Sequence, residues 1–122
     1  MARALVLTAD LLFGSNVQGM LAAAGQEVEL VADASALRDA LVVAAPVVVI
    51  VDLTDDALQG VQTVTEMREE HLLEGIPLVG YYSHVEPGVR ELALAEGFDL
   101  VVPRSRMARE CPQLIEQVLG PT

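Results

Sequence analysis

The sequence contains no lysine and no tryptophan, and aromatic residues make up only 3% of its 122 residues. Without lysine, neither a Schiff base nor a lysine clamp on phosphate can form. Hydrophobic residues still account for 52% of the chain, so its core has to be built from valine, leucine, alanine and isoleucine. Such a core suits alternating strands and helices better than an all-β sandwich, which is usually richer in aromatic residues.

Cysteine, long apolar runs and positive charge are also scarce. Cys111 is the single cysteine, which excludes an internal disulfide and favours a reducing compartment. No apolar run approaches the roughly 20 residues that a membrane-spanning helix needs. Seven basic residues against 18 acidic ones give a net charge of -11, which argues against nucleic acid and anionic membranes as partners. We therefore expect a cytoplasmic protein with neither kind of partner.

One pattern, a short apolar strand followed by an amphipathic helix, occurs five times along the chain. The predicted strands cover residues 4–8, 28–31, 47–52, 76–79 and 100–102. The first helix is predicted at about 15–24. Each of the four later helices is predicted from apolar residues at helical spacing. These residues are Leu37, Ala40, Leu41 and Ala44 in the second helix, Val61, Val64 and Met67 in the third, Val89, Leu92 and Ala93 in the fourth, and Leu114, Ile115, Val118 and Leu119 in the fifth. This alternation predicts one α/β domain over residues 1–122, a doubly wound three-layer sandwich whose five parallel strands have the order 2-1-3-4-5, with five helices.

The third predicted strand ends in a carboxylate. Five consecutive branched apolar residues, 47–51, indicate a strand buried on both faces, and Asp52 follows them. The carboxyl ends of parallel strands are where such sheets bind ligands, and the switch point between the first and third strands also gathers Asp10 and Thr54. A carboxylate there is costly to desolvate unless it is paired, hydrated or bound to a metal. Asp52 is therefore a candidate functional residue, with capping of the following loop as the alternative.

The pair formed by Asp52 and Gly60, eight residues apart, resembles the phosphoacceptor aspartate and the glycine opening the next helix in bacterial response-regulator receiver domains. In element order and length the resemblance covers nearly the whole chain. It implies a flavodoxin-like fold and two-component signalling, in which Asp52 accepts a phosphoryl group from a histidine kinase. Receivers also hold Mg²⁺ with two acidic residues after the first strand, the phosphoacceptor, and a backbone carbonyl two residues beyond it, here that of Thr54.

The Mg²⁺ ligands implied by this resemblance are incomplete. Counting without gaps puts Thr8 and Ala9 at the acidic pair, and only a one-residue slip brings in Asp10. Mg²⁺ requires near-octahedral oxygen coordination, usually with one or two carboxylates. Asp52, the Thr54 carbonyl and at best Asp10 therefore predict weak Mg²⁺ binding, and a loop cap is the alternative role for Asp10.

The phosphate-contacting positions depart from the receiver pattern as well. Tyr82, with Ser83 one step away, stands at the hydroxyl position after the fourth strand, and Arg104 stands at the lysine after the fifth. Arginine binds phosphate well, but its planar fork is bulkier than an ammonium and prefers bidentate geometry. We therefore predict a stand-alone divergent receiver or pseudo-receiver, not an enzyme, that acts mainly through protein–protein interaction with weak or absent phosphorylation of Asp52. The alternatives are a phosphorylation-competent response regulator and, more distantly, a flavodoxin-like cofactor-binding protein or enzyme.

Three of the seven arginines lie close together. Arg104, Arg106 and Arg109 fall within six residues of an otherwise acidic chain. Receiver domains like the one this chain resembles use the face formed by helix four, strand five and helix five to dimerise or to meet an output partner. The acidic residues on or beside the predicted fourth helix are Glu86, Glu91 and Glu96. Basic and acidic groups of two copies can therefore pair across a two-fold axis, and a scatter of solvated charges is the alternative.

Two further patterns carry little weight. Ser83 and His84 are adjacent at a strand end and generally point to opposite faces, and no nucleophile elbow is present, which disfavours a hydrolytic triad with Asp52. Residues 13–16 can cradle a phosphate at the start of the first helix, but they match no nucleotide-binding pattern.

Cys111 precedes Pro112, and we expect it to be packed near the start of the last helix.

Overall fold

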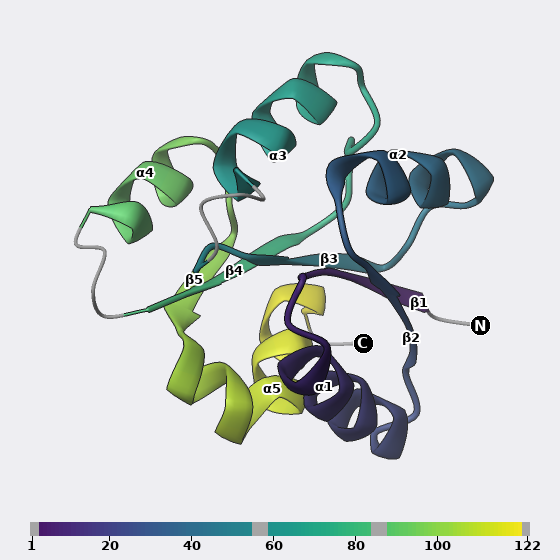
Figure 1. The fold of residues 1–122 in the computed structure, drawn as a ribbon, viewed down its shortest axis with the longest axis vertical. Coiled ribbons are helices and arrows are strands. Elements are labelled where there is room, and N and C mark those ends of the chain that lie inside the picture. The colour runs from purple at the N-terminus through teal and green to yellow at the C-terminus, as the bar shows by residue number, and fades with distance from the viewer. Residues whose placement is uncertain (1–2, 55–58, 84–87, 121–122) are drawn as a thin grey trace.

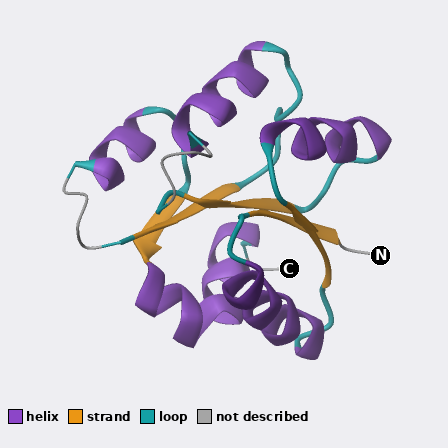
Figure 2. Ribbon diagram, viewed as in Figure 1, coloured by secondary structure: helices purple, strands orange, loops and turns teal. Residues whose placement is uncertain are grey.

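The computed structural model describes residues 3–54, 59–83 and 88–120, which form five parallel strands and five helices. The strands are β1 (Arg3–Leu7), β2 (Glu27–Val31), β3 (Val48–Asp52), β4 (Leu78–Tyr82) and β5 (Leu100–Pro103), in the order β2-β1-β3-β4-β5. The helices are α1 (Leu11–Ala23), α2 (Ala34–Val43), α3 (Gly60–Glu69), α4 (Val89–Ala95) and α5 (Arg104–Leu119). Helices α1 and α5 cover one face of the sheet and α2, α3 and α4 the other (Figure 1). The predicted doubly wound α/β sandwich is confirmed, and its three layers stand out in Figure 2.

Strand β3 is buried along its whole length and contributes to both cores. Val49 and Val51 pack in the core beneath α2, α3 and α4, whereas Val48 and Ile50 pack in the core beneath α1 and α5. This is the alternation expected of a central strand covered by helices on both faces. Asp52 follows Val48 and Ile50 at the same two-residue spacing, so its side chain points toward the face covered by α1 and α5.

Helix α1 begins earlier than predicted, at Leu11 instead of about residue 15. Asp10 is its N-cap, because the carboxylate Oδ1 accepts a hydrogen bond from the backbone N–H of Phe13 at 3.0 Å. The N–H of Gly14 donates to the Asp10 carbonyl at 2.9 Å. Residues 13–16 therefore lie inside the helix with backbone amides already bonded, which agrees with the little weight that a phosphate cradle there carried from the sequence alone.

Two residues predicted to face the core are exposed. Leu92 is 53% exposed on α4, a helix of seven residues in which Ala93 is the buried position. Ala44 is the C-cap of α2 with extended backbone angles, so the helix ends before this residue can reach the sheet. Periodicity alone did not reveal how short these two helices are.

Helix α5 is kinked in its middle. The backbone of Glu110 leaves the helical region (φ -127°), just before Cys111 and Pro112. Proline has no N–H for the preceding turn and its ring crowds the carbonyl four residues earlier, which accounts for the break. Cys111 is fully buried, as predicted, but it lies in the middle of α5 instead of near its start. Burial raises the pKa of its thiol to about 12.

A close approach of α3 to the end of β3 depends on Gly60. A Cβ at this position would lie 2.8 Å from Cγ1 of Val51, 2.9 Å from Cδ2 of Leu53 and 3.2 Å from the carbonyl oxygen of Asp52. Such distances are too short for ordinary packing, so only glycine fits without displacement. The spacing between Asp52 and Gly60 thus has a steric cause in this fold.

No helix in the described part of the chain combines the length and the hydropathy needed to cross a membrane.

Candidate functional site

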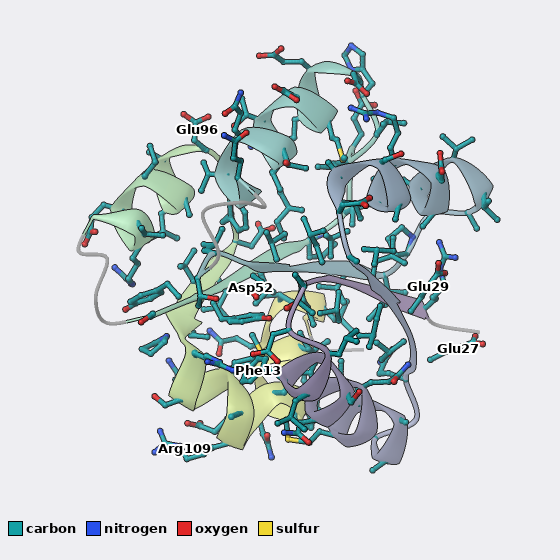
Figure 3. The ribbon with its side chains drawn as sticks, viewed as in Figure 1. Phe13, Glu27, Glu29, Asp52, Glu96 and Arg109 are labelled. Atoms are coloured by element: carbon teal, nitrogen blue, oxygen red, sulfur yellow. The ribbon has the colours of Figure 1, made fainter. Side chains whose placement is uncertain are left out.

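Asp52 lies at the edge of the sheet where the carboxyl ends of the strands meet. At this edge the chain passes from β1 to α1 on one face and from β3 to α3 on the other. This is the topological switch point of a doubly wound sheet, the usual place for a site. Thr8 directly follows β1, and Tyr81 of β4 is the register partner of Asp52. All three residues are buried, with Asp52 only 2% exposed. Figure 3 shows Asp52 close to the middle of the sheet and Phe13 on the side covered by α1 and α5.

Neutral donors occupy both oxygens of the Asp52 carboxylate. Oδ2 accepts the hydroxyl of Thr8 at 2.7 Å, and Oδ1 accepts the backbone N–H of Thr54 at 2.8 Å together with the Thr54 hydroxyl. Within the described residues no charged side chain bonds to this carboxylate. The hydrogen bonds offset the loss of hydration that a buried carboxylate would otherwise suffer.

Asp10 uses both of its oxygens elsewhere. Oδ1 caps α1 through the N–H of Phe13, and Oδ2 accepts a charge-assisted hydrogen bond from Nη2 of Arg104 at 2.7 Å. The Asp10 backbone N–H donates to the Thr8 hydroxyl at 3.0 Å, which links the start of α1 to the Asp52 network. The capping role, one of the two alternatives from the sequence, is the one this geometry displays.

The guanidinium of Arg104 packs on an aromatic pair. Its central carbon lies 4.5 Å from the centre of the Phe13 ring, and that ring lies 4.8 Å from the ring of Tyr81. A cation over an aromatic face is stabilised by the ring quadrupole, so Phe13 and Asp10 together hold Arg104 in place. Phe13 was missed as a partner of Arg104, because a helix predicted to start at residue 15 leaves it in a loop.

Tyr81 is a second residue that the sequence did not single out. Its hydroxyl is buried and has no hydrogen-bond partner among the described residues. Burial, and to a lesser degree the charge of Asp52, raise the pKa of Tyr81 above its ordinary range. The phenol is therefore a neutral group beside a buried carboxylate.

The predicted phosphate-contacting residues come together at one cavity. Tyr82, Ser83 and Arg104 line a space of about 400 Å³ with Phe13, Ser105 and Ala108. Tyr82 ends β4 opposite Pro103 of β5, and Arg104 starts α5 one residue further on. The grouping of these three residues matches the expectation, but their contact with a phosphoryl group on Asp52 stays a prediction.

The residues around Asp52 fit Mg²⁺ poorly. In the described ranges, no three His, Cys, Asp or Glu side chains converge to hold a metal ion. Thr8 and Thr54 place hydroxyl groups beside Asp52, whereas a divalent cation there would favour further carboxylates. Asp10, the other candidate ligand, is already paired with Arg104. Weak Mg²⁺ binding through Asp10, Asp52 and Thr54 stays a prediction.

The arginines predicted to form an interface have acidic partners within the same chain. Arg106 lies 3.6 Å and Arg109 3.7 Å from the Glu110 carboxylate, and Arg104 is paired with Asp10. Figure 3 shows Arg109 and Glu96 on opposite sides of the sheet, so within one chain they are far apart. The homodimer stays a prediction, and two residues named above, His84 and Glu86, lie outside the described residues.

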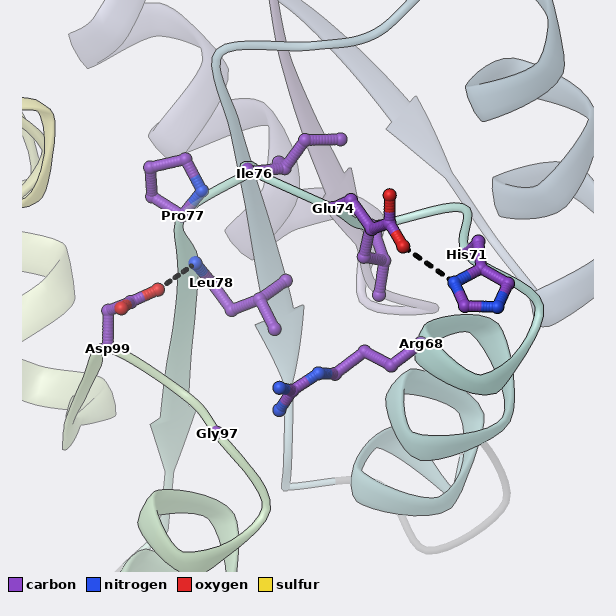
Figure 4. Close-up of a pocket in the computed structure, with 10 residues that line it drawn as sticks. Arg68, His71, Glu74, Ile76, Pro77, Leu78, Gly97 and Asp99 are labelled. Carbon is purple, nitrogen blue, oxygen red and sulfur yellow. Dashed lines mark hydrogen bonds and ion pairs between the residues drawn. The ribbon is translucent and has the colours of Figure 1, made fainter.

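Another cavity, of about 530 Å³, lies near the start of β4, at the edge of the sheet away from Asp52. Figure 4 shows Arg68 extending across it toward Gly97. Nδ1 of His71 is 2.6 Å from the Glu74 carboxylate, and Asp99 accepts the backbone N–H of Leu78 at 2.8 Å. This cavity lies at the amino ends of the strands, where doubly wound folds rarely place a site.

Comparison with known proteins defines the class of fold. No family model and no curated protein matches the sequence. Among solved structures, the receiver domain of NtrX from Brucella abortus is 22% identical, covering 98% of this chain and 99% of that domain with a TM-score of 0.84. Chemotaxis protein CheY4 from Vibrio cholerae is 20% identical, covering 97% of this chain and 98% of that one with a TM-score of 0.85. The chain thus has the fold of response-regulator receiver domains.

Two further structures complete the comparison. A putative response regulator from Chloroflexus aurantiacus is 15% identical, covering 98% of each chain with a TM-score of 0.87. A longer NtrX structure from Brucella abortus, solved in complex with ADP, is 23% identical with a TM-score of 0.84, and this chain spans only 26% of its length.

Proposed function

We propose that this chain is a divergent receiver-like signalling domain that works mainly by binding protein partners, with weak or absent phosphorylation of Asp52. The observation that supports it most is the engagement of Asp10 and Arg104 with each other. In a receiver the acidic group helps to hold the metal and the basic group neutralises the phosphoryl charge. Here each already neutralises the other.

Phosphorylation would also require Asp52 to exchange its partners. A carboxylate oxygen has to attack phosphorus while the donor's leaving group departs, and the new acyl phosphate brings further negative charge to a buried position. Thr8 or Thr54 would have to release the attacking oxygen, and Arg104, held by Asp10 and Phe13, makes no hydrogen bond to Asp52 within the described residues. Transition-state charge in phosphoryl transfer is normally stabilised by preorganised cations. Without that preorganisation, the reaction is slow.

A phosphorylation-competent response regulator is the second candidate. Its support is the position of Asp52 at the carboxyl end of β3, with a positive residue, Arg104, at the start of α5 on the same edge of the sheet. In this case a histidine kinase is the donor and an output protein the receiver of the signal. Both candidates assign the chain to protein partners.

Phosphorylation of Asp52 is tested by incubation with acetyl phosphate and millimolar Mg²⁺, followed by intact-mass measurement. We expect the native protein to show no gain of one phosphoryl mass beyond any gain that Asp52→Ala also shows. Asp33→Ala is a matched control, because Asp33 caps α2 through the N–H of Ala36, away from the site. A stoichiometric gain that Asp52→Ala abolishes and Asp33→Ala retains would establish the second candidate in place of the first. Bound flavin, or turnover of a substrate, would exclude both.

A further inference from the structure

The cavity lined by Phe13, Tyr82, Ser83, Arg104, Ser105 and Ala108, here called the aromatic cavity, combines apolar walls with one cation. Its volume of about 400 Å³ falls within the range of small-molecule sites, roughly 300–1,000 Å³. Two rings and an alanine methyl supply the apolar surface. The arginine supplies the charged group that fixes the orientation of a ligand.

Most of the N–H hydrogen-bond donors of the Arg104 guanidinium remain available at this cavity. One of its five N–H groups binds Asp10, and the others have no partner among the described residues. The side chain is 46% exposed, so a ligand can reach it from the cavity. A guanidinium fork that is already oriented, here by Asp10 and Phe13, loses little freedom on binding a second carboxylate. The arrangement favours a planar anion over a spherical one.

We propose that the aromatic cavity binds a small aromatic carboxylate, with the ring against Tyr82 and beside Phe13, and the carboxylate on Arg104. An uncharged aromatic molecule would gain the apolar contacts but leave the guanidinium unused. A nucleotide would bring several negative charges to a cavity lined by a single cation in a chain of net charge -11. The site adjoins Asp52 without including it, so this inference does not depend on whether Asp52 is phosphorylated.

Benzoate and benzamide are suitable probes because they share a ring and differ in charge. Amide and aromatic resonances of the native protein are followed during titration with each. For so small a ligand we expect benzoate to bind with a Kd of about 1 mM. Benzamide is expected to bind at least about tenfold more weakly, because it lacks the charge-assisted hydrogen bond. The largest shifts are expected at Phe13, Tyr82 and Ser105.

Two variants and one control assign the site. Ala108→Phe fills the aromatic cavity from an exposed helix position and should abolish saturable benzoate shifts, whereas Ala22→Phe, on an exposed position of α1, should leave them unchanged. Arg104→Gln should weaken benzoate binding about tenfold or more.

The proposal is overturned if benzoate gives no saturable shifts, if Ala108→Phe leaves them intact, or if benzamide binds equally well. Saturable shifts that move with Ala22→Phe instead would assign an adventitious surface site, and would also overturn it. The phosphodonor experiment can fail or succeed independently of all these outcomes.

Discussion

Thr8→Asp should make the stability of the fold depend on Mg²⁺. Thr8 is 1% exposed and its hydroxyl lies 2.7 Å from the Asp52 carboxylate, so the substitution puts two carboxylates side by side in a buried place. One of them must then remain unpaired or take up a proton. We expect a loss of about 3 kcal/mol in the free energy of unfolding without Mg²⁺ at neutral pH.

A divalent cation between the two carboxylates removes most of this penalty. At a Mg²⁺ concentration of about 100 times the Kd, binding to the folded state adds about 2.7 kcal/mol. Lower pH should also lessen the loss, because repulsion raises the folded-state pKa of the pair and protonation of one member then favours folding. Urea unfolding with and without millimolar Mg²⁺ measures the effect. Thr8→Asn is the control of similar size without the charge, and equal Mg²⁺ dependence in both variants would contradict the prediction.

Gly60→Ala should destabilise the protein by about 1–3 kcal/mol. The new methyl group would meet Val51 and Leu53 at under 3 Å, and the carbonyl of Asp52 at 3.2 Å, so α3 has to shift away from β3. Because that carbonyl belongs to Asp52 itself, the shift disturbs the candidate site. The free energy of unfolding in urea and the Asp52 and Thr54 amide resonances report the two effects.

Gly19→Ala is the matched control for this substitution. Gly19 lies inside α1, and nothing lies within 4 Å of the position that a Cβ would take. Alanine there should stabilise the helix by about 0.5–1 kcal/mol, because it restricts the unfolded chain more than glycine does. Equal stability changes at the two positions would show that the contact at Gly60 is not tight.

The alternation of strands and helices predicted a parallel sheet, because each βαβ crossover has one preferred hand, and the order 2-1-3-4-5 was expected because it is a common arrangement of doubly wound sheets. The run 47–51 located β3 and placed Asp52 at the correct edge of the sheet. These predictions depend on local periodicity and on general rules of connection. They need no knowledge of which side chains meet.

The partners of the site residues could not be predicted in the same way. Whether Asp10 faces Asp52 or caps α1 is decided by where the helix starts, and a carboxylate before an apolar run fits either role. The contact of Arg104 with Asp10 joins residues 94 positions apart, which no spacing rule anticipates. Thr8 was placed at an acidic position by counting, and this could have signalled that a hydroxyl rather than a carboxylate meets Asp52.

The most direct test of the central claim is a titration with beryllofluoride and Mg²⁺, followed through amide spectra of the native protein and Asp52→Ala. Beryllofluoride imitates a phosphoryl group on a carboxylate, and it needs the same oxygen atom and the same neighbouring cations. With Asp52 held by Thr8 and Thr54, and Arg104 held by Asp10, we expect no shift that depends on Asp52 at any attainable Mg²⁺ concentration. Saturable shifts at Asp52, Ser83 and Arg104 that vanish in Asp52→Ala would contradict the account.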